Sequence, residues 1–282
     1  MAHAATIAEA RRSAPLAFLL RITDAIAALT LAADLAVIIG SVTARSLFNA
    51  PVEWSDDVAR GLMVASSFFG AAGALARAEN AGVAFFVDKV SSGARRVIDS
   101  VSALLIVIIA AYVAYHAIDL GYMTTGQTTG SGLPLEWTFY PMGVGAACMT
   151  AFALDQYIRR GMTDILQSVA IVVAICAAWF AWSSLAPNTV PNPGVLMLVS
   201  FVLSLCGGLA IGFALALAAL IFIWAEGTLP GVIFAHQMAR GIDNFVLLAI
   251  PFFILVGYLM EANGMSVRLI ALLERLGYPT GG

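Results

Sequence analysis

Long apolar segments recur along the chain, and they constrain its fold more than any other feature. A helix needs about 20 apolar residues to cross the hydrocarbon core of a bilayer, which is about 30 Å thick. Hydrophobic residues make up 61% of the 282 positions and charged residues only 11%, against about 25% charged in ordinary soluble domains. Because lipid offers backbone groups no hydrogen-bond partner, these segments fold as helices. The sequence therefore predicts an all-α integral membrane protein.

The apolar segments predict about six to seven membrane helices. The predicted spans are 15–44, 54–75, 94–123, 135–157, 165–185, 195–224 and 243–260. Two further stretches, 77–90 and 265–276, alternate apolar and charged residues at helical spacing and are predicted to be amphipathic helices in the membrane interface. The stretch 226–241 is short and polar and is interpreted as a connector.

The strongest boundary in the chain is the proline-rich stretch 186–194, APNTVPNPG, which cannot continue a helix. It divides the sequence into a four-helix membrane domain over 1–160, a connecting helix with its linker over 161–193, and a further membrane domain over 194–282.

The second span opens with a polar cluster. Trp54 is expected at the membrane interface, and Ser55 is expected to cap the helix start. Asp56 and Asp57 fall in the first turn, where carboxylates complement the helix dipole, and Arg60 follows within reach of them. We interpret this cluster as a helix start and subunit contact rather than as an acid/base pair.

Polar residues within the first span have their own expected partners. Arg21 and Asp24 are three residues apart and are able to pair on one helix face near the membrane surface. Asp34 lies deeper and is expected to face protein rather than lipid.

The segment 243–260, DNFVLLAIPFFILVGYLM, is expected to be irregular. Asp243 or Asn244 is placed to cap its start, and Pro251 disfavours helical geometry at Ile250, so the helix is expected to bend or unwind there. Gly257 would allow another helix to approach closely. Two interpretations stay open, an ordinary kinked helix and the broken helix of a transporter.

No motif for catalysis or for a cofactor stands out. His116 is either a ligand or, with more support, a hydrogen-bonded or interfacial histidine, since no second histidine lies at matching depth. Asp34 and Asp119 are either members of a proton relay or structural partners of backbone or arginine. The three cysteines have no metal-binding spacing, and the net charge of −3 does not suggest a nucleic-acid partner. The expectation is therefore no enzyme, no catalytic or metal site and no bound cofactor.

Basic residues in the loops predict the orientation. They concentrate on one side of the predicted spans, which places the amino terminus in the cytoplasm. The residues concerned are Arg11, Arg12, Arg77, Lys89, Arg95, Arg96, Arg159, Arg160 and Arg240. Arg268 and Arg275 fit this pattern less well, which favours a partial or irregular crossing by the segment 243–260.

Two sets of motifs resemble the tripartite ATP-independent periplasmic (TRAP) transporters. The first four spans resemble the small membrane subunit, through Trp54, Asp56, Asp57 and Arg60, the Gly-Ala-Ala of 70–72, Arg77 before VAFFVDKV, and LPLEWTFYPMGVG over 133–145. The family often has histidine where this chain has Asn80. The second set resembles the start of the large membrane subunit, in GLAIGFAL over 208–215, where Ala210 replaces the usual proline, and in the whole of 241–270.

The resemblance implies a component of a sodium-driven secondary transporter for an organic acid such as a dicarboxylate or sugar acid. It implies a bacterial inner-membrane location and three partners: a periplasmic substrate-binding protein, the remainder of the large membrane subunit and the lipid bilayer. Sodium is the coupling ion of the family, but the sodium- and substrate-binding hairpins belong to later spans that this chain lacks. A fragment or split gene product is therefore expected.

Two competing classes of membrane protein share these features. One is a membrane scaffold or assembly subunit that does not transport. The other is a small redox enzyme, which the lack of paired histidines disfavours.

Overall fold

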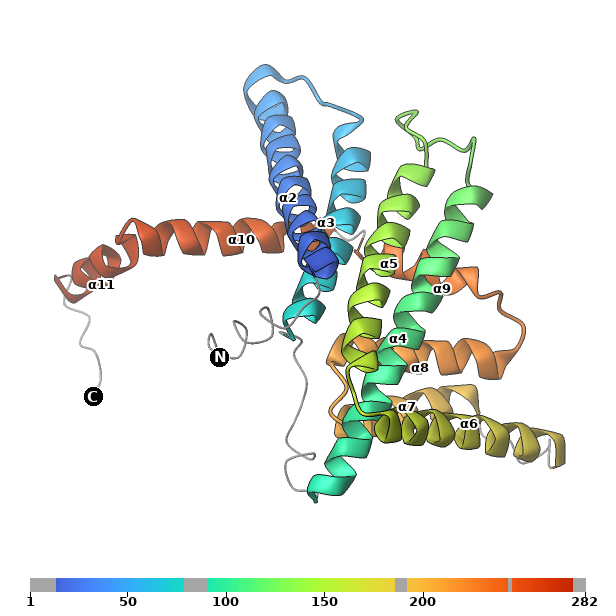
Figure 1. Ribbon diagram of the computed structural model, residues 1–282. Coiled ribbons are helices and arrows are strands. Elements are labelled where there is room, and N and C mark those ends of the chain that lie inside the picture. Colours follow the sequence, from blue (N-terminus) through green and yellow to red (C-terminus); the bar gives the residue numbers. More distant parts are fainter. Residues whose placement is uncertain (1–13, 79–90, 186–191, 243–244, 276–282) are drawn as a thin grey trace. The chain divides into compact units, whose positions relative to one another are not determined.

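The computed structural model describes residues 14–78, 91–185, 192–242 and 245–275, and their regular structure is helical (Figure 1). The helices are α2 (Ala14–Phe48), α3 (Ser55–Arg77), α4 (Ser92–Met123), α5 (Glu136–Ile158), α6 (Met162–Leu185), α7 (Pro193–Cys206), α8 (Ile211–Glu226), α9 (Val232–Ile242), α10 (Phe245–Ala262) and α11 (Met265–Arg275). The chain divides into two compact units, Met1–Ala239 and Arg240–Gly282, which are described separately.

Four helices of the described chain have the length and hydropathy to cross a membrane. They are Pro15–Phe48, Ser55–Arg77, Gly93–Met123 and Met162–Leu185, and they correspond to the predicted first, second, third and fifth spans. The predicted fourth span corresponds to α5, whose 23 residues extend about 33 Å at 1.5 Å per residue. The prediction of an all-α membrane protein is confirmed.

In the first unit, α2, α3, α5 and α4 pack against one another in that spatial order, and α6 and α8 both contact α4. The four helices share one apolar core, formed by Leu20, Ala72, Leu75, Ala76, Ala110, Met149, Phe152 and Ala153. Many of its members are alanine, so the helix backbones approach closely, as is common where helices associate within lipid.

Two glycines let α5 fit between its neighbours. A Cβ at Gly145 would lie 2.8 Å from the Cβ of Phe68 and 3.1 Å from its carbonyl carbon, both on α3. A Cβ at Gly143 would lie 2.7 Å from Cγ1 of Ile118 on α4. Neither position has room for a larger residue, so the packing of α5 against α3 and α4 depends on these glycines.

The predicted sixth span, 195–224, is wrong. The segment forms two short helices, α7 and α8, that pack against each other as a hairpin. Gly208 lies in the turn with φ 76°, a backbone conformation that glycine adopts without steric cost. At 14 and 16 residues, the two helices extend only about 20 to 24 Å each, less than the hydrocarbon thickness.

The hairpin begins and turns at residues whose local chemistry suits those positions. The Asn192 side chain accepts a hydrogen bond from the Gly194 amide at 2.9 Å, and Pro193 occupies the first helical turn, where its missing N–H is harmless. Ala210, at the start of α8, has φ −58°, the value that a proline ring imposes. The chain therefore leaves helical geometry there even without the usual proline of the resembled family.

In the second unit, α10 continues as an uninterrupted helix from Phe245 to Ala262. The helix was expected to bend or unwind at Ile250. The unwinding is wrong, since helix extends through Pro251, and the bend stays a prediction. Gly264, with φ 63°, terminates the turn between α10 and α11, and α11 matches the predicted amphipathic helix.

The close packing at Gly145 generates a test. Gly145→Ala should lower the thermal unfolding midpoint of the detergent-solubilised protein, because overpacking a tight contact costs about 1–3 kcal/mol and outweighs the gain of about 1 kcal/mol in helix propensity. Gly70→Ala is the matched control, since a Cβ there meets no atom of the described residues within 4 Å. Equal shifts for the two variants would contradict the close approach of α3 and α5.

Candidate functional site

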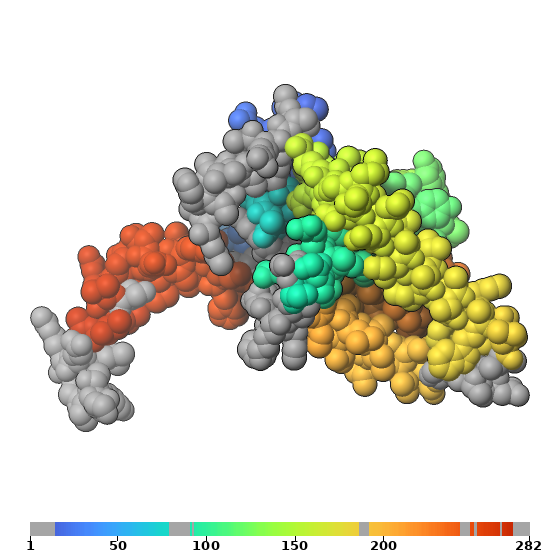
Figure 2. Space-filling view, turned by 60° about the horizontal axis from the view of Figure 1, so that its bottom comes forward, coloured from blue at the N-terminus to red at the C-terminus, as the bar shows by residue number. Residues whose placement is uncertain are grey.

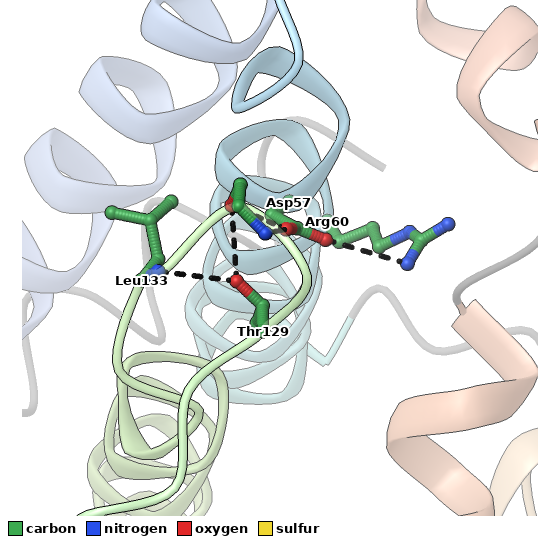
Figure 3. A network of polar contacts seen from close by, with 5 residues as sticks. Asp57, Arg60, Thr129 and Leu133 are labelled. Carbon is green, nitrogen blue, oxygen red and sulfur yellow. Dashed lines mark hydrogen bonds and ion pairs between the residues drawn. The ribbon is translucent and has the colours of Figure 1, made fainter.

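A polar network ties the beginning of α3 to the loop that joins α4 and α5 (Figure 3). The hydroxyl of Ser131 donates to Oδ2 of Asp57 at 2.5 Å, and its amide lies 3.4 Å from the same oxygen. Arg60 lies 3.6 Å from Oδ1 of Asp57, one helical turn along α3. The Asp57 carboxylate therefore links two segments that are 74 residues apart in the sequence.

The loop itself is held in one conformation by its own hydrogen bonds. The Leu133 amide donates to Oγ1 of Thr129 at 3.2 Å, and the hydroxyls of Thr129 and Ser131 are 3.0 Å apart. Gly132 adopts φ 85°, which closes the turn, and the Leu135 amide donates to the Gln127 carbonyl at 2.9 Å. These loop residues were not predicted as partners of Asp57, because no local sequence pattern links them to it.

The predicted helix start is correct in part. Asp56 and Asp57 do lie in the first turn of α3, and Trp54 is about half exposed beside it. Ser55 is not the cap that was predicted: it is the first helical residue, and its hydroxyl donates to the Val52 carbonyl at 2.7 Å and lies 2.8 Å from the hydroxyl of Ser41 on α2.

At the opposite end of α3, Arg77 pairs with Asp24 of α2. Its Nη1 donates to both carboxylate oxygens, at 2.9 and 2.8 Å. Gly73 lies beneath this pair, since a Cβ there would sit 2.5 Å from Oδ1 of Asp24. The predicted pairing of Arg21 with Asp24 is therefore replaced by a bond between two helices, which fixes α2 against α3.

The same end of the bundle is closed by side chains of α5. The amide of Gln156 donates to the carbonyls of Leu75 and Ala76, at 2.9 and 3.3 Å, and so ties the end of α5 to the last turn of α3. The hydroxyl of Tyr157 lies 2.8 Å from that of Ser168, and both residues are buried, which fixes α6 at its junction with α5.

Two arginines follow α5. Arg159 donates to Asp155 at 2.8 Å, and this hydrogen bond raises the pKa of the guanidinium further above its usual range. Arg160 donates to Oγ of Ser100 on α4 at 3.3 Å. Arg159 and Arg160 lie at the same end of the bundle as Arg77, Arg95 and Arg96, and we call it the arginine-rich end.

The polar stretch 226–241, interpreted as a connector, contains the helix α9. Phe234, Ala235 and Ala239 form its buried face. The ring of Phe234 packs edge-on against Tyr112 of α4, with centroids 5.8 Å apart. Apolar residues at helical spacing were the signal that could have revealed this helix.

The backbone at Gly231, just before α9, lies against two side chains of α4. A Cβ at this position would overlap the hydroxyl of Tyr112 and would lie 2.6 Å from Nε2 of His116. The two rings contact each other in a tilted arrangement, with centroids 4.3 Å apart and planes inclined by 55°. His116 therefore serves as packing for the start of α9, and its Nδ1 is buried without a hydrogen-bond partner among the described residues.

The intramembrane carboxylates are not brought together. Asp34 is 1% exposed, which confirms that it faces protein. Asp119 belongs to α4, which α3 and α5 separate from α2. A relay between the two carboxylates therefore has no support in the packing order of the bundle. In the ranges that the structure describes, no group of three potential metal ligands occurs.

The remaining predicted site residues lie in or near the second unit. Asp243 and Asn244 are outside the described residues, so the predicted cap there stays a prediction. Within the second unit, a Cβ at Gly257 would meet no described atom within 4 Å, and the predicted close approach of another helix stays a prediction.

The fold and these contacts define a multi-pass membrane protein in which a helical bundle is followed along the chain by shorter helices. Comparison with known families assigns both parts. Residues 34–162 match the DctQ component of the tripartite ATP-independent periplasmic transporters, and residues 198–282 match the DctM component of the same transporters.

Individual relatives agree with this assignment. The isethionate TRAP transporter permease protein DctMQ of Oleidesulfovibrio alaskensis is 28% identical over 233 residues, covering 81% of this chain and 36% of the relative. The sialic acid TRAP transporter permease protein SiaT of Haemophilus influenzae is 24% identical over 271 residues, covering 87% of this chain and 42% of the relative. The sialic acid TRAP transporter large permease protein SiaM of Vibrio cholerae is 43% identical over 79 residues, covering 27% of this chain and 18% of the relative.

The chain therefore belongs to the TRAP transporters and joins a small-subunit region to a large-subunit region in one polypeptide. It spans less than half the length of the fused permeases that it matches. The domain boundaries at 160 and 193 stay a prediction.

The loop network generates the first test of this site. Asp57→Ala removes the acceptor of Ser131, and a hydrogen bond to a charged group contributes about 1.5–3 kcal/mol, so amides of residues 124–135 should exchange with solvent about 10 to 100 times faster. Hydrogen-exchange mass spectrometry measures this.

Asp56→Ala provides the control for that test. It removes a neighbouring first-turn carboxylate that is exposed, so any general effect on the helix dipole is shared by the two variants. Similar exchange in both would show that Asp57 does not hold the loop.

The contact at Gly231 generates a second test. Gly231→Leu should displace α9 from α4, because the new side chain overlaps Tyr112 and His116, and trypsin should then cleave after Arg240 faster. Gly212→Leu in α8 is the control, since a Cβ there meets no described atom within 4 Å. Cleavage rates that do not differ between the two variants would contradict the docking of α9 on α4.

Proposed function

We propose that the chain is a membrane component of a sodium-coupled secondary transporter that takes up an organic acid delivered by a periplasmic binding protein. The observation that carries the proposal is the presence of both membrane-subunit regions of one transporter family, in order, on one polypeptide. In this proposal the DctQ-type bundle is a scaffold, and the DctM-type region belongs to the transporting part.

The substrate class follows from the relatives. Their names include isethionate, sialic acid and 2,3-diketo-L-gulonate, all of which are organic anions. The carboxylate or sulfonate is the shared chemical feature, so we propose an organic anion of this kind rather than a dicarboxylate in particular.

The proposed orientation follows from the charges at the two ends of the bundle. The arginine-rich end, where α3 and α5 end and α4 begins, carries five arginines. The loop between α4 and α5, at the other end, carries no basic residue. Basic residues are retained on the cytoplasmic side. We therefore propose that the chain lies in an inner membrane. The loop that Asp57 holds is then on the periplasmic side, from which a binding protein delivers substrate.

The test is uptake by the bacterium that carries the gene. Deleting the gene should abolish uptake of a radiolabelled organic acid, and a plasmid copy should restore it. Replacing external Na⁺ by K⁺ should reduce the restored uptake to the level of the deletion strain, because the proposed driving force is then absent.

The controls distinguish the alternatives. Uptake that survives the deletion would favour a scaffold that does not take part in transport. Uptake that is insensitive to Na⁺ but collapses with a proton uncoupler would contradict sodium coupling.

A further inference from the structure

A partly open cavity of about 180 Å³ lies at the arginine-rich end of the bundle, among the end of α3, the early turns of α4 and the end of α5. Figure 2 is turned so that this end faces the reader, with the first turns of α4 in green beside α5 in yellow-green. All of its lining residues fall within the DctQ-type region. The network at Asp57 lies at the opposite end of α3.

The polar part of the lining combines a cation and an anion. Arg160 follows α5, and Asp99 and Ser102 project from α4. Arg160 has five N–H donors, and its contact with Ser100 is a long 3.3 Å. The carboxylate of Asp99 is exposed at the mouth.

The rest of the lining, apart from Gln156, is apolar. Ala103, Ile106 and Ala153 line the cavity beside Leu75, and Leu75 and Ala153 belong to the core of the bundle. Gln156 also lines the cavity, and its amide is committed to the carbonyls of Leu75 and Ala76. The wall is therefore preorganised, with a charged rim and an apolar floor.

The position and the volume of the cavity indicate which kind of ligand it is able to bind. Arginines gather where a bundle meets the cytoplasmic headgroup layer, so the cavity lies near the depth of lipid phosphates. At about 180 Å³ it is smaller than the roughly 300–1,000 Å³ of pockets that enclose whole drug-sized ligands, and it suits a headgroup with the rest of the molecule outside.

We propose that this cavity binds the headgroup of a phospholipid that carries both a phosphate and an ammonium group. The phosphate accepts hydrogen bonds from the Arg160 guanidinium, and from the Ser102 hydroxyl when it exchanges its long 3.4 Å contact with the Gly207 carbonyl for the phosphate. The ammonium pairs with Asp99, and the glycerol end lies on the apolar floor near Ile106. A free phosphate ion would use only the first of these contacts, and an anionic lipid without an ammonium would be repelled by Asp99.

Lipid retention by the purified chain tests the proposal. The protein is exchanged into detergent with equal amounts of phosphatidylethanolamine and phosphatidylglycerol, and retained lipid is counted by native mass spectrometry. The wild-type chain should retain one phosphatidylethanolamine, and Arg160→Gln should weaken its retention about tenfold or more. Arg159→Gln is the matched control, since the neighbouring arginine donates to Asp155 and does not line the cavity.

Asp99→Asn tests the choice of headgroup and keeps the test valid if Arg160→Gln fails to fold, because Asp99 is exposed. This variant should lose the preference for phosphatidylethanolamine over phosphatidylglycerol. Equal retention by the Arg160→Gln and Arg159→Gln chains would overturn the proposal, as would an unchanged preference in Asp99→Asn. Displacement of the lipid by millimolar inorganic phosphate would show an anion site instead and would also overturn it.

Discussion

The close approach of α5 to α3 and α4 is the contact on which the described bundle depends. Within lipid, apolar surface gains little from meeting other apolar surface, so helices associate through tight packing and hydrogen bonds. Gly143 and Gly145 allow that packing on two sides of α5. Since α4 in turn contacts α6, α8 and the start of α9, the placement of these elements rests on the same contact.

Hydrogen bonds at the two ends of the bundle complete what the glycines allow. Asp57 holds the loop between α4 and α5 at one end, and Arg77 joins α3 to α2 at the other. Gln156 ties the end of α5 to the last turn of α3, and Tyr157 fixes the junction with α6. The match to the DctQ component assigns this bundle to the small-subunit part of the family.

The long helices of the bundle were predictable, because the length of an apolar run determines whether a helix is able to span a bilayer. The hairpin of α7 and α8 was not predictable in this way, since its turn at Gly208 lies inside one continuous apolar run and depends on a single backbone conformation. The expected unwinding at Pro251 fails because a helix tolerates the loss of one hydrogen bond.

The candidate site was predictable only in part. Asp57 was predicted in the first turn of its helix, whereas Arg77 was assigned to the interfacial stretch 77–90 and lies instead in the last turn of α3. Their partners were not predicted, because Ser131 is 74 residues from Asp57 and Asp24 is 53 residues from Arg77. Such pairs are set by the packing of helices, on which local pattern carries no information.

The most direct test of this account is the orientation of the bundle in the bacterial membrane. Gly130→Cys and Gly161→Cys place single exposed thiols at its two ends, in a chain whose three native cysteines have been replaced by alanine. A membrane-impermeant maleimide should label the thiol at position 130 in intact spheroplasts, and the thiol at 161 only after the membrane is permeabilised. The opposite pattern would place the Asp57 loop in the cytoplasm and contradict its position on the substrate-receiving side.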